Sequence, residues 1–212
     1  MESASLWSLI VKGGPVMVPI IVLSVVALAL TLERLAALWR IRLDLHRFQG
    51  EVEQLVQKGQ FQKAVARCRQ VRHPIGKVLE AGVAGRGRPR EELEKAMERI
   101  GEEQVEHLER RLGALVAIVS VEPMLGFLGT IVGLIKAFMS WERLGANVTV
   151  DSLAAGIYQA MITTAAGLIV AIPFFICYHL FVGRIRRHAA DMSSGGNRLL
   201  DLLGGRRPGG EA

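Results

Sequence analysis

The sequence predicts an all-α membrane protein with three transmembrane helices and long helical extensions in the cytoplasm. Two observations lead to this fold class. Half of the 212 residues are hydrophobic, and they are concentrated in long blocks, with densely charged segments between them. Lys and Arg are concentrated in only some of those charged segments. Such a pattern is typical of a chain that alternates between lipid and water.

The first apolar block predicts a transmembrane helix over residues 13–38, after an extracytoplasmic segment at 1–12. Residues 13–32 contain no Asp, Glu, Lys or Arg. A helix of that length extends about 30 Å, which matches the hydrocarbon core of a bilayer. Pro15 and Pro19 stand near its start, where a helix tolerates proline.

Residues 39–111 have the composition of a soluble helical region. Turn residues divide it into helices at 43–58, 61–69 and 75–84, and a fourth begins at Pro89. The fourth is rich in Glu and Arg, and only Gly101 interrupts it before the next apolar block. We therefore expect it to continue into the membrane as one long helix.

The second and third transmembrane helices are expected at 112–140 and 152–183, joined by a periplasmic loop at 141–151. The third block has no Asp, Glu, Lys or Arg, and as a helix of about 48 Å it would protrude from the bilayer. The basic, Gly-rich tail at 184–212 is predicted to be disordered in the cytoplasm.

The distribution of basic residues predicts the orientation. Residues 39–111 contain 16 Lys or Arg and residues 183–212 contain 6, whereas residues 1–12 and 141–151 contain one each. Because cytoplasmic loops carry the excess of Lys and Arg, the N-terminus is expected outside and the C-terminus inside. This distribution also explains the net charge of +6 without a nucleic-acid partner.

Each of the last two apolar blocks has one face of small and polar residues. Sorting side chains at 100° per residue places these residues together on the second and third spans. The second-span face contains Glu122, Gly126, Gly129, Thr130, Gly133, Lys136, Ala137 and Ser140, and the third-span face contains Gly156, Gln159, Ala160, Thr163, Thr164 and Gly167.

Two interpretations of these faces are open. Small residues allow close helix packing, which suits Gly126, Gly129, Gly133, Gly156 and Gly167. Glu122 and Gln159 are costly against lipid, and such residues usually face a bundle interior or a wet cavity. A polar path shared among several copies of the chain would accommodate them, because three helices are few for a monomeric transporter.

Other classes of function find no support in the sequence. Cys68 lies in a charged segment and Cys177 in an apolar one, so a disulfide between them is not expected, and no metal-binding spacing occurs. No cofactor motif is present. A membrane-anchored enzyme is a weak alternative, because the region 39–111 has no cluster of catalytic residues.

Two segments resemble the signatures of the ExbB/TolQ/MotA proton-channel family. Residues 122–135 (EPMLGFLGTIVGLI) are similar to its second-span signature, and residues 156–168 (GIYQAMITTAAGL) with 171–173 (AIP) to its third. The likeness extends over nearly the whole chain, including 13–17 (GGPVM) and Leu32-Glu33-Arg34. The three spans and the short cytoplasmic region are closer to ExbB and TolQ than to MotA.

The resemblance implies a homopentamer in the bacterial inner membrane around a single-span partner of the ExbD/TolR type. Such complexes use the proton-motive force for mechanical work on a periplasm-spanning protein of the TonB/TolA type. The protonatable Asp belongs to the partner, and Thr130 and Thr164 correspond to the channel's polar residues. Whether the system serves TonB-dependent import, a Tol-Pal-type system or gliding is left open.

The chain departs from the family pattern at two positions. Gln159 stands where many members have Glu, and Glu122 stands where many have a small residue. Gln cannot titrate, although it can orient water or bond the partner's Asp. We count Thr130, Thr163, Thr164, Gln159 and Glu122 as the candidate ion pathway.

Acidic residues before the second span offer a further candidate site. Glu102 and Glu106 are expected to line a cytoplasmic vestibule that attracts cations, while a solvated face of Glu/Arg pairs is the alternative. At the level of the whole protein, a non-conducting scaffold that positions a periplasmic partner is the alternative to a proton channel.

Overall fold

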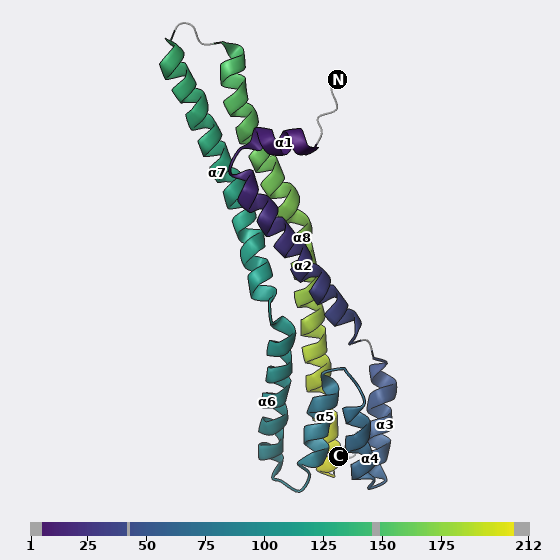
Figure 1. Cartoon of the computed structure of the whole chain (residues 1–212). Coiled ribbons are helices and arrows are strands. Elements are labelled where there is room, and N and C mark those ends of the chain that lie inside the picture. Colours follow the sequence, from purple (N-terminus) through teal and green to yellow (C-terminus); the bar gives the residue numbers. More distant parts are fainter. Residues whose placement is uncertain (1–5, 42, 146–148, 206–212) are drawn as a thin grey trace. The chain divides into compact units, whose positions relative to one another are not determined.

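Every regular element in the described part of the chain is a helix. The computed structural model describes residues 6–41, 43–145 and 149–205, and within them eight helices follow one another (Figure 1). They are α1 (Leu6–Gly13), α2 (Met17–Trp39), α3 (Leu45–Gln57), α4 (Phe61–Arg69), α5 (Ile75–Ala84), α6 (Arg90–Glu109), α7 (Leu112–Leu144) and α8 (Val150–Leu203).

Three of these helices are long and apolar enough to cross a membrane. They are α2, α7 and the portion of α8 from Leu153 onward, with mean hydropathy of 2.0 to 2.2 in their most apolar windows. Large apolar side chains lie exposed along all three, among them Val25, Phe127 and Ile169. Exposed apolar surface on this scale suits contact with lipid or with other chains.

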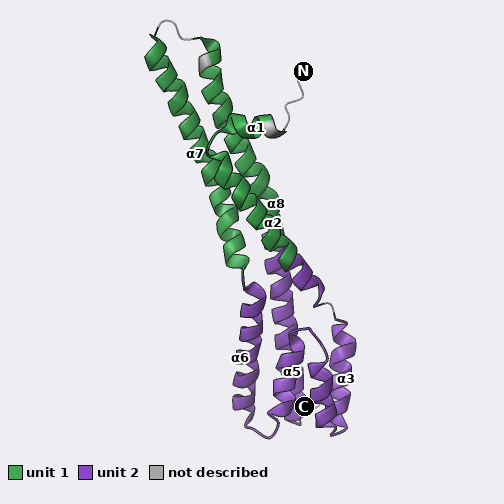
Figure 2. Cartoon of the chain, viewed as in Figure 1, with its two compact units in different colours: residues 1–33, 111–179 green, residues 34–110, 180–212 purple. Residues whose placement is uncertain are grey.

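The helices divide into two compact units, which Figure 2 distinguishes by colour. Unit 1 comprises residues 1–33 and 111–179, and unit 2 comprises residues 34–110 and 180–212. Unit 1 therefore contains α1, α7 and most of α2 and of the apolar part of α8. Unit 2 contains α3 to α6 and the C-terminal end of α8.

In unit 1, glycines bring the backbones of α7 and α8 into direct contact. A Cβ atom added at Gly133 would lie 2.6 Å from the carbonyl oxygen of Gly156, and one at Gly167 would lie 2.6 Å from that of Glu122. One at Gly126 would lie 3.1 Å from the carbonyl oxygen of Thr163. No larger residue fits these positions unless the helices move apart.

Unit 2 has a conventional apolar core. Amphipathic helices α3 to α6 and the end of α8 supply it, and Asp44 caps α3 by accepting the backbone N–H of Arg47 at 3.2 Å. Its fully buried members are Phe48, Val52, Val56, Ala64, Cys68, Ile75, Val78, Leu79, Val83, Leu93, Met97, Met192, Leu199 and Leu200. Burial raises the pKa of Cys68 to about 12, so this thiol is unreactive.

The structure corrects three expectations. The fourth helix does not run unbroken into the membrane: α6 ends at Glu109, Arg111 adopts a left-handed conformation (φ 72°), and α7 begins at Leu112. The segment 184–203 is not disordered, because α8 continues through it. A short helix, α1, occupies residues for which no helix was expected. The end of the predicted disordered tail, 206–212, lies outside the described residues.

Candidate functional site

The polar side chains of α7 and α8 meet within unit 1. We call this set, Glu122, Thr130, Lys136, Gln159, Thr163 and Thr164, the polar seam. Its members from α7 lie at positions 122, 130 and 136, so they are spread over about 21 Å of helix. Glycines on both helices bring the backbones close enough for side chains of the two helices to hydrogen-bond.

Two threonine hydroxyls lie at the centre of the polar seam. The Oγ1 atoms of Thr130 and Thr164 are within hydrogen-bonding distance of each other. Thr164 also donates to the carbonyl oxygen of Gly126 at 3.1 Å, and Thr130 lies 3.3 Å from the carbonyl oxygen of Ala160. Both side chains are half-buried, so the pair remains reachable from outside the chain.

Thr163 has a different environment from its neighbour. It is fully buried, and its hydroxyl donates to the carbonyl oxygens of Gln159 and Ala160, each at 3.0 Å. Its side chain also contacts Gly129 on α7. Its hydroxyl therefore bonds within its own helix, and its position suits helix packing more than exchange with an outside group.

Lys136 and Gln159 form the polar seam's contact nearest the C-terminal end of α7 and the N-terminal end of α8. The Nζ of Lys136 donates to Oε1 of Gln159 at 3.0 Å. Gln159 is 6% exposed, and its Nε2 has no hydrogen-bond partner among the described residues. Gly14, in a left-handed conformation (φ 72°), closes over this amide, because an added Cβ would lie 2.7 Å from Nε2. A cavity of about 710 Å³ adjoins the pair and is lined also by Ser140 and Arg143.

Glu122 lies toward the opposite end of the polar seam, on α7. It is fully buried, and neither carboxylate oxygen has a hydrogen-bond partner among the described residues. A carboxyl group in such a place requires a proton, a water molecule or a group from another chain. No hydrogen bond in the described part of the chain joins Glu122 to the threonine pair, eight residues away along α7.

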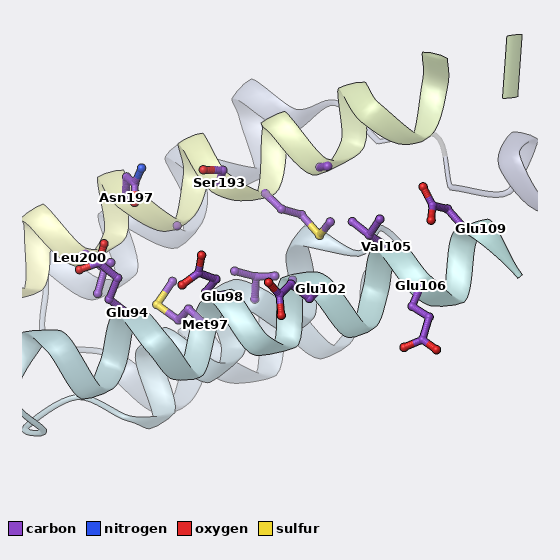
Figure 3. A pocket seen from close by; sticks show the side chains of 15 residues that line it. Glu94, Met97, Glu98, Glu102, Val105, Glu106, Glu109, Ser193, Asn197 and Leu200 are labelled. Atoms are coloured by element: carbon purple, nitrogen blue, oxygen red, sulfur yellow. The ribbon is translucent and has the colours of Figure 1, made fainter. Parts of the chain in front are cut away.

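The candidate vestibule residues line a groove in unit 2. A space of about 530 Å³ between α6 and α8 is bordered by five glutamates and floored partly by Met97, Val105 and Met192. In Figure 3, Glu98 and Glu102 reach toward this space, and Glu106 projects away from α8. The five glutamates are Glu94, Glu98, Glu102, Glu106 and Glu109.

Sequence reasoning missed two contacts. Lys136 was placed on the second-span face but not as the partner of Gln159, and the contact between His73 and His188 was not anticipated. The partners are 23 and 115 residues apart. Helical periodicity assigns a residue to a face of its own helix, but it does not say which residue of another helix lies opposite.

The protein has several helices of membrane-spanning length, and they enclose hydroxyl, amide, amine and carboxyl groups. It is therefore a multi-pass membrane protein with an internal polar seam. The chain belongs to the MotA/TolQ/ExbB proton channel family, whose profile matches residues 70–194. The matched region covers α7 and most of α8, and thereby the whole of the polar seam.

Individual relatives agree with this assignment. A biopolymer transport ExbB homologue of Methanothermobacter thermautotrophicus is 33% identical over 175 residues, 82% of this chain and 62% of the relative. An ExbB-like protein of Synechocystis is 34% identical over 181 residues, 81% of this chain and 68% of that protein. The Tol-Pal system protein TolQ of Haemophilus influenzae is 38% identical over 85 residues, 40% of this chain and 37% of that protein. The chain thus spans less than two thirds of the Methanothermobacter relative.

Proposed function

We propose that this chain is the channel subunit of a membrane motor that couples proton flow to mechanical work. In this proposal five copies surround the membrane helix of a single-span partner of the ExbD/TolR type in the bacterial inner membrane. The complex acts on a periplasm-spanning protein of the TonB/TolA type. The N-terminus lies in the periplasm, and unit 2 lies in the cytoplasm with its excess of basic residues.

The observation that carries the proposal is the hydroxyl pair of Thr130 and Thr164. Each hydroxyl has one hydrogen to donate and two lone pairs. When Thr164 donates to the carbonyl oxygen of Gly126, Thr130 has a choice between Thr164 and the carbonyl oxygen of Ala160. The pair therefore has more than one hydrogen-bonded arrangement without any movement of the helices.

Such a pair suits the recognition of a carboxyl group that gains and loses a proton. A carboxylate only accepts hydrogen bonds, whereas a protonated acid also donates one. Reorienting hydroxyls satisfy both forms. A partner helix with one Asp would be held by a threonine pair, discharged by protonation, and free to move to the pair of the next copy.

The two ends of the polar seam complete the proposed pathway. Lys136 and Gln159 lie toward the periplasmic end, where a cation beside an amide is suited to hold a carboxylate. Glu122 lies toward the cytoplasmic end as a proton-binding group within the chain itself. The glutamates of the α6–α8 groove, including Glu102 and Glu106, would raise the local concentration of cations where protons leave. One proton crossing 100 mV releases about 2.3 kcal/mol.

The decisive experiment removes a single hydroxyl. The tagged chain is purified from native membranes together with its bound partner proteins, and the complex is reconstituted into lipid vesicles. Proton uptake is driven by a potassium diffusion potential. Thr164→Val, which is nearly isosteric, is expected to lower uptake about tenfold, since losing a buried hydrogen bond costs about 1–3 kcal/mol. Ser24→Ala is the matched control, because that hydroxyl donates to the carbonyl oxygen of Ile21 on its own helix.

The alternative function, a non-conducting scaffold, gives the opposite result. In a scaffold the threonines serve packing, so proton uptake would be at the level of protein-free vesicles for both the parent and Thr164→Val. Co-purification of the bound partner is measured in parallel. A loss of proton uptake supports the channel function only if the Thr164→Val variant co-purifies with the same partner as the parent protein.

A further inference from the structure

Two histidines far apart in the sequence are in direct contact within unit 2. His73 lies just before α5 and is 3% exposed, and His188 lies on α8. Nε2 of His73 is 3.0 Å from Nδ1 of His188, and the rings meet edge to face with centroids 4.8 Å apart. This contact ties the α4–α5 connection to the C-terminal part of α8.

The hydrogen bonds around His73 determine its protonation state. Its Nδ1 accepts the backbone N–H of Ile75 at 3.2 Å, so that nitrogen carries no hydrogen. The hydrogen of the neutral ring is therefore on Nε2, and it is donated to Nδ1 of His188. In this arrangement both rings are neutral, and neither His73 nitrogen has a free lone pair with which to bind a metal ion.

Among the described residues, α8 and α3 contribute charged groups near the histidine pair. On α8 itself, a carboxylate oxygen of Asp191 lies within 4.8 Å of the histidine nitrogens, and the charge of Arg184 acts on His188. Beside the pair is a cavity of about 480 Å³, to which α3 contributes Asp44 at its start; the cavity is otherwise lined by Ile41, Leu43 and Leu45. The carboxylate of Asp44 already accepts the N–H of Arg47.

We propose that His73 and His188 form a pH-sensitive link that holds α8 to the α4–α5 connection when both rings are neutral. A proton added to Nδ1 of His188 removes the lone pair that accepts from His73, so the link is lost. The charged ring then has Asp191, three residues along the same helix, as its partner. Neutral His188 thus bonds to His73 of another element, whereas charged His188 has Asp191 of its own helix as its partner.

The electrostatics of the two histidines give the direction of the pH dependence. Burial, and secondarily the neighbouring His188, lower the pKa of His73 from 6.5 to about 4, so this ring stays neutral near pH 5. Burial also lowers the pKa of His188 below 6.5, although the neighbouring Asp191 raises it. A histidine whose pKa is lower in the folded state than in the unfolded chain makes its full contribution to stability at pH values above the unfolded-state pKa. The contribution of His188 therefore declines as the pH falls below about 6.5. The link is therefore intact at neutral pH and opens on acidification.

If the proposed function is correct, the histidine pair lies on the side of the membrane that receives the protons. Acidification of the cytoplasm would then loosen the attachment of α8 in unit 2. Proton entry would thereby act back on the motor through the histidine pair. This consequence rests on the proposed function, whereas the pH-sensitive link itself is tested without proton transport.

Hydrogen exchange on the purified full chain tests the link. Protection of the amides in 184–203 is compared at about pH 7.5 and about pH 5, corrected for the intrinsic exchange rate with an unstructured peptide. The parent is expected to lose protection about fivefold at the lower pH, as suits the loss of one hydrogen bond. His188→Asn retains an acceptor near the position of Nδ1 but cannot titrate there, so its protection is expected to change less than about twofold.

Two further variants separate the link from general effects of pH. His46→Gln removes an exposed histidine of α3 and is expected to behave like the parent. His73→Asn keeps an acceptor for the Ile75 N–H but loses the contact with His188, so it is expected to show the lower protection already at pH 7.5. A fivefold pH effect that survives in His188→Asn, or no pH effect in the parent, overturns the proposal. So does an increase in the parent's melting temperature with excess Zn²⁺ that His188→Asn lacks, because the pair would then be a metal site.

Discussion

At the scale of single residues, Glu122 is the clearest departure from a tightly packed helix pair. It is fully buried on α7, and its two carboxylate oxygens have no hydrogen-bond partner in the part of the chain that the structure describes. Residues of this kind inside membranes are costly, and they usually take part in ion pathways or pair with another chain.

Replacing Glu122 by Gln tests its proposed role as a proton-binding group. The amide has nearly the same volume and polarity but cannot bind and release a proton at neutral pH. We expect Glu122→Gln to fold and assemble normally and to lower proton uptake in reconstituted vesicles about tenfold. Glu92→Gln, at an exposed position on α6 outside the α6–α8 groove, serves as the control. Unchanged uptake in Glu122→Gln would restrict this residue to a structural role.

At the residue level the sequence named candidates but not their contacts. Thr130 and Thr164 were candidates because both lie on the polar faces of the last two spans and match the family signatures, and their role in an ion pathway stays a prediction. The hydrogen bond of Gln159 with Lys136, and that of His73 with His188, could not be foreseen. Both depend on how elements far apart in the sequence pack against each other, and the side-chain pattern of one element carries no information about that packing.

At the scale of helices, the contact between α7 and α8 depends on backbone proximity. Each Cβ position at Gly126, Gly133, Gly156 and Gly167 is close to backbone atoms of the opposite helix, which have no rotamer to change. A flexible side chain could move away from an added methyl group, but these backbone atoms cannot. Interhelical packing in the membrane therefore tolerates no methyl group at these positions.

Gly133→Ala tests this packing. The added methyl group would meet the carbonyl oxygen of Gly156 at 2.6 Å and the amide nitrogen of Ala160 at 2.8 Å. We expect a loss of stability of about 1–3 kcal/mol, read as a lower thermal unfolding midpoint in detergent. Gly183→Ala, inside α8 with open space around its Cβ position, is expected to be neutral or stabilising by up to about 1 kcal/mol. Equal effects of the two substitutions would contradict close packing at Gly133.

The boundaries of helices show where local sequence signals fail. The bounds of α4 and α5 agree with the sequence prediction because Gly, Pro and His-Pro sequences separate these helices. The break at Arg110 and Arg111 has no such signal. Arg111 instead forms an ion pair with Glu33, which is distant in the sequence. A helix end held by a partner so remote cannot be located from local propensity.

The length of α8 is a second example. The basic residues from Arg184 and the glycines at 204, 205, 209 and 210 predict a disordered tail. In the structure Gly195 lies against Gln49 and Ile75, and Leu199 and Leu200 are buried in the core of unit 2. Burying these leucines stabilises a helix that its own residues favour only weakly.

At the scale of the whole molecule, a chain with this polar seam is expected to require copies of itself. Lipid explains the exposed apolar surfaces of α2, α7 and α8, but it offers no hydrogen-bond partner to the half-buried hydroxyls of Thr130 and Thr164 or to the carboxyl group of Glu122. We expect the protein purified in detergent to have a protein mass of five 23.2-kDa chains, measured by native mass spectrometry or by light scattering corrected for detergent. A monomer or dimer would exclude a shared central pathway and leave the polar seam as a packing surface.

The sequence by itself determined the environment of each segment. Hydrophobic blocks of membrane-spanning length, charged segments between them and two signature motifs were sufficient for an all-helical membrane protein of the MotA/TolQ/ExbB family. These properties are local, because transfer of a segment into lipid depends on its own composition.

Only the tertiary structure decided which side chains meet. It brought the hydroxyl of Thr130 to Thr164, the amine of Lys136 to Gln159 and the ring of His73 to His188, and it left the carboxyl group of Glu122 without a partner among the described residues. The physical reason is that such contacts depend on the distance and register between helices. Glycine packing and burial of the apolar core set that distance and register across positions far apart in the chain.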